Sequence, residues 1–271
     1  MTPMPSLPAS ARLAINRCNL PAVILGSLAF QQWPQTLEID GVHQIHRELF
    51  NLLDAITEPS QRALQFQEYM RCSFLLDHPD QAGYNPNGQR RRLKADYRRL
   101  LRGWLFNSDS QEGAVLKGWV ESRFGLLPRY HQHPIRSPDS TAYLDYLSQR
   151  MAGLYNTNSL EAQIDLLYSY AQYELNRQYP AQTHQRLYRA FNHQDQHEWL
   201  RQQPPILLLN NLSSFSSDPT SIESFGDHLW HADIPHAKVL YFPGLLESGL
   251  QGESEWLVLG GLCQMAVNRP A

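Results

Sequence analysis

Two carboxylates near the C-terminal end of the chain, Glu253 and Glu255, are spaced in a way that could do chemistry. In an extended segment, residues i and i+2 point to the same side, so both side chains would share one face, roughly 7 Å apart at the backbone. Such a pair is either a solvated strand face or a catalytic pair. Two glutamates alone favour the solvated face, so the choice depends on what the rest of the chain places beside them.

Two further polar features interrupt apolar, strand-like segments. Arg189 lies in the segment LYRAF, where a buried guanidinium needs either a carboxylate of this chain or an anion such as pyrophosphate. In NNLSSFSS, Ser214 and Ser216 share one side if the segment is extended. Their hydroxyls could orient a carboxylate or bind a ribose, or they could simply end a strand. The lack of a Gly-x-Ser-x-Gly motif argues against a nucleophilic serine.

The secondary structure that must position these residues is expected to change along the chain, from helices to strands. Apolar residues recur at helical spacing in the segments 42–56, 60–76, 89–106 and 158–177. Strand patterns follow in the segments 206–215, 228–234, 237–242 and 255–267. The sequence therefore predicts an α+β fold. A mainly helical part, residues 1–180, packs on a β-rich catalytic core of mixed or antiparallel strands, residues 181–271, as one integrated unit.

Two segments suggest recognition surfaces. Residues 89–106 are expected to form an amphipathic helix with seven basic residues. Its arginines are either simply solvated or a docking surface for an acidic protein or a nucleotide phosphate. The glycine-containing turn 241–255 carries Leu245, Leu246 and Leu250, which favours a recognition loop that leads into the paired glutamates.

Composition argues against several classes of function. The net charge of −3 and the lack of a nucleic-acid motif argue against a nucleic-acid partner. The apolar segment 21–30 is too short to span a membrane, and no small-residue cleavage site follows it, so export is not expected. Three cysteines without a Cys-x-x-Cys motif predict a reducing cytoplasm. The eleven histidines form no recognisable ligand set, so no metal site is expected.

A strand arginine, a serine cluster and Glu-x-Glu after a glycine-containing loop, in this order, resemble the arginine–serine–glutamate class of ADP-ribosyltransferases. Longer stretches, including NLPAVILGSLAF, GLYNTNSLEAQIDLLYSYAQYEL and LLLNNLSSFSSD, are similar to the family of NAD(+)–dinitrogen-reductase ADP-D-ribosyltransferases. The resemblance implies a β core of ADP-ribosyltransferase type. It also implies transfer of ADP-ribose from NAD to one arginine of dinitrogenase reductase, which switches nitrogen fixation off, and regulation by a PII signal-transduction protein.

The resemblance also implies roles for individual residues. Glu255 matches the catalytic glutamate and Glu253 the acid two residues before it, while Ser214 falls in the serine motif that orients the glutamate. That motif reads Ser-Phe-Ser-Ser here in place of the usual Ser-Thr-Ser, so the sequence leaves open which serine contacts Glu255. Ala190 stands where many relatives have glycine. The residues expected to bind NAD are Arg189, Tyr188, Ala190, Ser214, Ser216 and Asn211.

Two other functions stay open on the sequence alone. With water as the acceptor, the protein would be an NAD glycohydrolase, although Glu253 would then have no guanidinium to hold. A non-catalytic scaffold that senses NAD and binds nitrogenase or a PII protein is the other alternative, and the intact arginine, serine and glutamate set argues against it.

Overall fold

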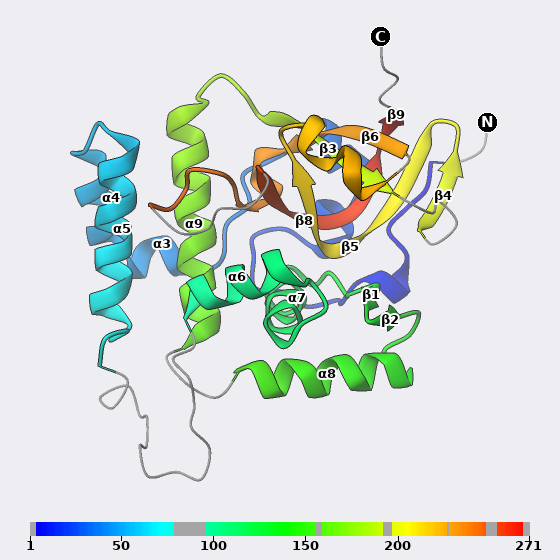
Figure 1. The fold of residues 1–271 in the computed structure, drawn as a ribbon, viewed down its shortest axis with the longest axis horizontal. Helices are drawn as coiled ribbons and strands as arrows, with labels where there is room; N and C mark the ends of the chain where they lie inside the picture. Colours follow the sequence, from blue (N-terminus) through cyan, green and yellow to red (C-terminus); the bar gives the residue numbers. More distant parts are fainter. Residues whose placement is uncertain are drawn as a thin grey trace.

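The structure is a computed structural model, and it describes residues 4–78, 96–154, 159–191, 197–226, 228–247 and 254–267. Figure 1 shows a sheet built from the C-terminal part of the chain, with the helices of the N-terminal part beside and beneath it. The predicted α+β class is confirmed, and all the strand pairs in the main sheet are antiparallel.

The helical part follows the predicted periodicity with local differences. Its elements in the described residues are η1 (Ala9–Ala11), α1 (Ala22–Leu25), α2 (Leu28–Gln32), α3 (Val42–Ile45), α4 (Arg47–Asp54), α5 (Pro59–Ser73), α6 (Tyr97–Phe106), α7 (Gln111–Phe124), the short hairpin of β1 (Tyr130–His131) and β2 (His133–Pro134), α8 (Thr141–Leu154) and α9 (Leu160–Gln178). The single helix predicted over 42–56 is two helices, because His46 leaves helical geometry between α3 and α4.

The C-terminal part of the predicted basic helix is confirmed as α6, Tyr97–Phe106. Residues 89–95 lie outside the described residues, and α6 begins at Tyr97. Asp96 caps this helix, since its side chain accepts a hydrogen bond from the Arg99 backbone N–H at 2.8 Å. None of the helices in the described ranges is long and apolar enough to cross a membrane.

The strands form the C-terminal layer. They are β3 (His184–Phe191), β4 (Glu198–Gln202), β5 (Pro205–Ser216), β6 (His228–Pro235), β7 (Val239–Tyr241), β8 (Glu255–Gln264) and β9 (Ala266–Val267), with 3₁₀ turns η3 (Thr220–Phe225) and η4 (His236–Lys238). The sheet has the order β7-β8-β5-β3-β6-β9, and β4 pairs with β5. The run predicted over 255–267 breaks at Met265 into two strands that pair with different neighbours.

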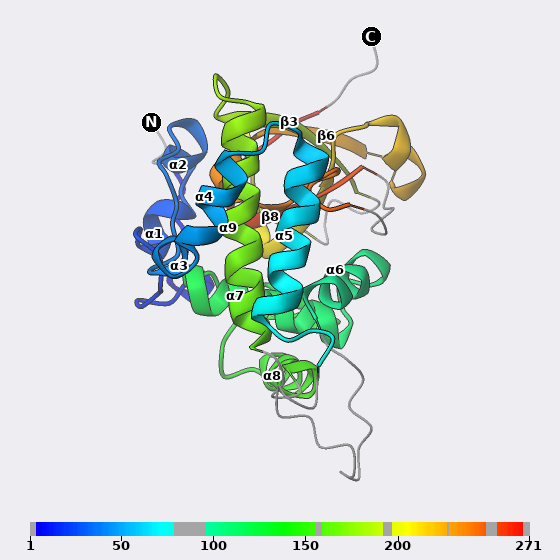
Figure 2. The same ribbon diagram turned by 90° about the vertical axis from the view of Figure 1, so that its left-hand side faces the viewer.

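The two parts share one hydrophobic core. Helix α9 packs between β7 on one side and α3 and α5 on the other, and α7 packs under β5 with α8 outside it (Figures 1 and 2). A single cluster of buried apolar side chains runs from Leu7 to Met265 and includes residues of both parts. The position of the strands therefore depends on the helices that cover them.

The segment that contains α1 and α2 is held against β8 by a close backbone contact. Gly261 has a φ of +105°, and a Cβ atom there would lie 2.6 Å from the Cα atom of Gly26. Leu262 N donates a hydrogen bond to Gly26 O at 2.8 Å. The Gln31 side chain binds both backbone groups of Gln264, at 2.7 and 3.1 Å. These contacts hold the strand that carries Glu255.

A buried ion pair joins α5 to α9, and it yields the first prediction. Arg62 and Glu174 are both buried and form two hydrogen bonds, of 2.6 and 2.8 Å. Glu174→Gln leaves the guanidinium charge buried without its counter-ion, so we expect the free energy of unfolding to fall by about 3–5 kcal/mol in urea titrations. Glu68→Gln, which breaks the exposed pair of Glu68 with Arg71, is the matched control and should change stability little. Equal losses in the two variants would contradict this expectation.

Candidate active site

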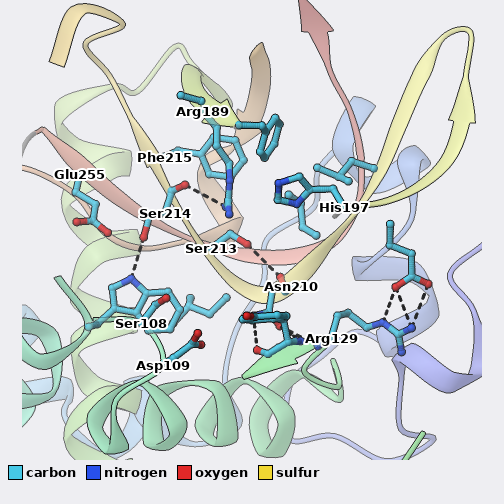
Figure 3. A pocket seen from close by; sticks show the side chains of 18 of the residues that line it. Ser108, Asp109, Arg129, Arg189, His197, Asn210, Ser213, Ser214, Phe215 and Glu255 are labelled. Atoms are coloured by element: carbon cyan, nitrogen blue, oxygen red, sulfur yellow. Dashed lines mark hydrogen bonds and ion pairs between the residues drawn. The ribbon is translucent and has the colours of Figure 1, made fainter. Parts of the chain in front are cut away.

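The cleft opens where the sheet splits. β3 pairs with β6 along its whole length, but it pairs with β5 only at Tyr188 and Ser216. β5 is paired with β8 on its other edge from residue 206 to residue 216, and β4 covers only residues 205–208 of the open edge. A cleft of about 630 Å³ lies between the diverging strands (Figure 3). This volume is in the usual range for small-molecule sites, about 300–1,000 Å³.

The cleft gathers most of the site residues that the sequence analysis named. They come from three strands that are far apart along the chain. The lining includes Tyr188, Arg189 and Ala190 from β3, Ser214 and Ser216 from β5, and Glu255 from the first position of β8. Sheet pairing brings them together, because Ser216 is the partner of both Tyr188 and Glu255.

Arg189 is half-buried and has the chemistry of an anion site. Its guanidinium lies 5.5 and 5.7 Å from the ring centroids of Phe191 and Phe215, and its Nη1 donates a hydrogen bond to Ser214 O at 3.2 Å. Among the described residues it forms no ion pair with a carboxylate. Burial lowers the pKa of Arg189 to about 10, and the charge of Glu255 acts in the opposite direction. The side chain therefore stays a cation at neutral pH, with an environment that favours binding an anion.

The serines of the cluster have different partners. Ser216 is buried and its hydroxyl belongs to the turn that follows β5, where it accepts a hydrogen bond from Asp218 N and donates to Asp218 O, each at 3.0 Å. The hydroxyl of Ser214 accepts a hydrogen bond from Trp104 Nε1 at 2.9 Å. Ser213 is buried and donates to Asn210 O at 3.4 Å. Ser214 and Ser216 lie on the face of β5 that Glu255 shares.

Asn211 does not line the cleft, in contrast to the prediction. The register between β5 and β8 shifts at residues 210 and 211, where β5 carries one residue more than its partner. At this bulge Asn211 turns its buried amide toward α7 and donates to Lys117 O at 2.8 Å and Leu126 O at 3.0 Å. Asn210 lines the cleft instead, and its side chain binds the backbone of Arg129 and Tyr130. A bulge is not visible in a sequence pattern, so the asparagine pair gave no signal of it.

The turn before β8 is only partly described. Glu253 and Leu250 lie outside the described residues, so the structure does not test the geometry of the glutamate pair. Leu245 is buried in the core, and it therefore does not present an apolar surface to a partner as the sequence analysis expected. Gln67 on α5 donates a hydrogen bond to Glu247 O at 3.2 Å, which ties this turn to the helical part.

The opposite wall of the cleft comes from the segment 104–109. Its first three residues end the predicted helix 89–106, but the sequence analysis assigned none of these residues to the site. A buried cation holds this wall in place. Lys117 on α7 is buried and donates to Asp109 Oδ1 at 2.8 Å, and its ammonium lies 5.6 Å from the centroid of the Trp104 ring. Burial and the neighbouring Lys117 lower the pKa of His131 to about 4, so His131 is neutral and its Nδ1 can accept from Lys117 at 3.2 Å. In the sequence, the lysine inside the apolar run VLKGWV was the one feature that could have indicated a buried cation here.

The described residues contain no group of three or more histidine, cysteine, aspartate or glutamate side chains that could hold a metal ion. The three cysteines are free thiols, two of them buried. The cleft lining itself offers a guanidinium, a carboxylate and hydroxyl groups.

The position of Asn211 predicts a structural effect. Asn211→Ala removes the hydrogen bonds to Lys117 O in α7 and to Leu126 O just after it. Two buried carbonyl groups then have fewer donors, so we expect the free energy of unfolding to fall by about 1–3 kcal/mol in urea titrations. Asn176→Ala, on the exposed face of α9, is the control and should leave stability unchanged. Unfolding of the Asn211 variant at the same urea midpoint as the parent protein would contradict the expectation.

Comparison with known proteins agrees with these features. The model of the family described as dinitrogenase reductase ADP-ribosyltransferase matches residues 15–267. The chain is 38% identical over 253 residues to the NAD(+)–dinitrogen-reductase ADP-D-ribosyltransferase of Rhodospirillum rubrum, and the alignment covers 91% of each protein. No solved structure matches the chain. The resemblance noted in the sequence is thereby confirmed, and the chain belongs to the dinitrogenase reductase ADP-ribosyltransferase family.

Proposed function

We propose that this protein transfers ADP-ribose from NAD to an arginine of dinitrogenase reductase, and so inactivates nitrogenase. The family supports this reaction, since the relative from Rhodospirillum rubrum has NAD and dinitrogen reductase in its name. The structural observation that carries the proposal is Arg189. It is a half-buried cation without an ion-paired carboxylate in the described residues, and it shares a cleft with Glu255.

The β3 side of the cleft would hold the NAD phosphates. The planar guanidinium of Arg189 can donate to two phosphate oxygens at once, and its low-polarity surroundings between Phe191 and Phe215 strengthen that contact. Tyr188 and Ala190 flank the arginine and line the same cleft. We therefore assign these three residues to the binding of NAD.

Glu255 would act on the ribose. When the bond between nicotinamide and ribose breaks, its electron pair goes to the nicotinamide nitrogen and positive charge develops on the ribose. A carboxylate at the 2′-hydroxyl stabilises this oxocarbenium-like transition state. Glu255 lines the cleft and is close enough to Arg189 for its charge to raise the pKa of the guanidinium, which supports this assignment.

The acceptor needs a second acid. An arginine side chain has a pKa above 12 and must lose a proton as its nitrogen bonds to the ribose carbon. We assign the positioning of this guanidinium, and the uptake of its proton, to Glu253, two residues before Glu255. This residue lies outside the described part of the chain, so its assignment rests on the sequence and the family.

Two parts of the proposal concern the setting of the reaction. We place the enzyme in the cytoplasm with its protein substrate, which agrees with its sparse, free cysteines. We also propose a PII signal-transduction protein as a regulator, on the resemblance alone. Neither assignment affects the chemistry of the cleft.

The transfer reaction is tested with labelled NAD and native dinitrogenase reductase. Glu255→Gln removes the charge that stabilises the ribose cation, so we expect the rate of labelling of one target arginine to fall by about 10²–10³-fold. Glu48→Gln, on the exposed side of the outer helix α4, is the matched control and should label at the normal rate. Release of nicotinamide without labelling would instead indicate a glycohydrolase, and binding of NAD with no turnover would indicate a scaffold.

The exposed arginines of α6 are candidates for docking the protein substrate. Arg99 pairs with Glu112 at 3.1 Å and is half-buried. Arg98, which pairs with Asp96 at 3.4 Å, and Arg102 are exposed on the same helix, whose last residues join the wall of the cleft. If the target presents an acidic rim there, reversing both charges with Arg98→Glu and Arg102→Glu should raise KM for the protein by roughly tenfold at low salt, since steering charges change on-rates by about 10- to 10³-fold.

The readout of this docking experiment separates the two substrates. KM for NAD should not change in the Arg98 and Arg102 variant, and the effect on the protein substrate should shrink as salt is added. Arg17→Glu with Arg47→Glu, two exposed arginines outside the cleft lining, reverses the same number of charges and is the control for net charge. An unchanged KM for dinitrogenase reductase in the double variant would exclude α6 as a docking surface.

A further inference from the structure

Trp104 connects the helical part of the protein to the serine cluster. It lies near the end of α6, is buried, and donates the hydrogen of its indole Nε1 to the hydroxyl of Ser214 at 2.9 Å. Figure 3 draws this bond as the dashed line that ends on the hydroxyl of Ser214. The two residues are 110 positions apart in the chain. This hydrogen bond joins the wall formed by residues 104–109 to the strand that faces Glu255.

The direction of this hydrogen bond limits what Ser214 can do. An indole N–H can only donate, so the serine oxygen must be the acceptor, and the single hydrogen of the hydroxyl is left for another acceptor. The backbone O of Ser214 meanwhile accepts from Arg189 Nη1 at 3.2 Å. Ser214 is therefore held by two donors, one from each wall of the cleft.

Glu255 lies within reach of that remaining hydrogen. Ser214 is the strand partner of Leu257, and Glu255 lies two residues before Leu257 on the same face. Such diagonal neighbours in an antiparallel pair are about 7–8 Å apart at the backbone, a distance that a glutamate side chain spans. The hydroxyl of Ser216 is directed to Asp218 in the following turn instead.

We propose that Trp104 is a positioning residue for the transfer reaction, because its indole fixes the hydroxyl of Ser214 as a donor to the carboxylate of Glu255. This proposal rests on the proposed function and resolves which serine serves the glutamate. Trp104 need not touch NAD for this role. It acts through Ser214. It should therefore change the rate of the step in which positive charge develops on the ribose.

The indole is itself held in one orientation. The ammonium of Lys117 lies 5.6 Å from its ring centroid, a distance at which a cation is attracted to the ring face. Lys117 is in turn fixed by its ion pair with Asp109 at 2.8 Å. A buried cation held by a carboxylate thus keeps the ring from turning away from the serine, so the donor is in place before substrate binds.

The test replaces the indole by a ring without a donor. Trp104→Phe should lower kcat for labelling of dinitrogenase reductase by about 2- to 10-fold, the factor that one net hydrogen bond is worth, with KM for NAD unchanged. Ser214→Ala should lower kcat at least as much, and adding Trp104→Phe to it should have no further effect, because Trp104 acts only through the hydroxyl. Independent, multiplying effects of the two substitutions would overturn the proposal.

A matched control separates positioning from packing. Trp119→Phe removes another buried indole hydrogen bond, that of Trp119 to Asp165 at 2.6 Å, at a site outside the cleft lining. It should lower the melting temperature without changing kcat, whereas an equal loss of kcat in both tryptophan variants would show a merely structural role and overturn the proposal.

The same assays distinguish this proposal from the proposed function. If the parent protein labels no target, the proposed transfer fails, and the variants are compared by release of nicotinamide, which depends on Glu255 whatever the acceptor. A twofold or greater fall in that release in Trp104→Phe, absent in the Ser214→Ala background, would support the positioning role. A parent protein that releases no nicotinamide either, or unchanged kcat in Trp104→Phe of an active parent, would overturn it.

Discussion

The divergence of β3 from β5 is the constraint on which the rest of the structure depends. Because the strands meet only at Tyr188 and Ser216, backbone groups of β5 face a cleft in place of a neighbouring strand. Exposed strand edges need other partners, and the Arg189 side chain supplies one by binding Ser214 O. Arg189, which we assign to the NAD phosphates, thus also gives a backbone carbonyl at the open edge of β5 a hydrogen-bond donor. The strand divergence that opens the cleft is therefore also what leaves that carbonyl for Arg189 to bind.

The lining arginines differ in a way that explains why one of them can bind a ligand. Glu198 on β4 forms ion pairs with Arg129 at 2.9 Å and Arg136 at 2.6 Å. Arg189 forms no such pair with the described residues, and it is packed against aromatic rings. A half-buried charge without a counter-ion is partly desolvated, so an anion that binds in this cleft gains most at Arg189.

Helix α7 fixes the opposite wall through buried charges. Lys117 pairs with Asp109, Arg123 pairs with Asp165 and Glu161, and the Glu121 carboxylate accepts from two tyrosine hydroxyls of α8. The partners of Arg123 lie on α9, those of Glu121 on α8, and that of Lys117 in the segment 104–109, so these interactions join α7 to all three. Helix α7 is buried on nearly all sides and still carries charged side chains, because each buried charge has its partners. Removing a partner would leave a buried charge uncompensated, so these pairs favour one packing of α7 over others.

The sequence by itself determined the α+β class, the strands that carry Arg189, the serines and Glu255, and the family, because apolar periodicity and short motifs are local properties. It did not predict α7 as a separate helix, since a helix buried on all sides has no amphipathic period. Tertiary structure decided the roles of Asn210 and Asn211, through a one-residue bulge, and of Trp104, through a partner 110 residues away. Such pairings depend on how the chain closes on itself, and no local pattern encodes them.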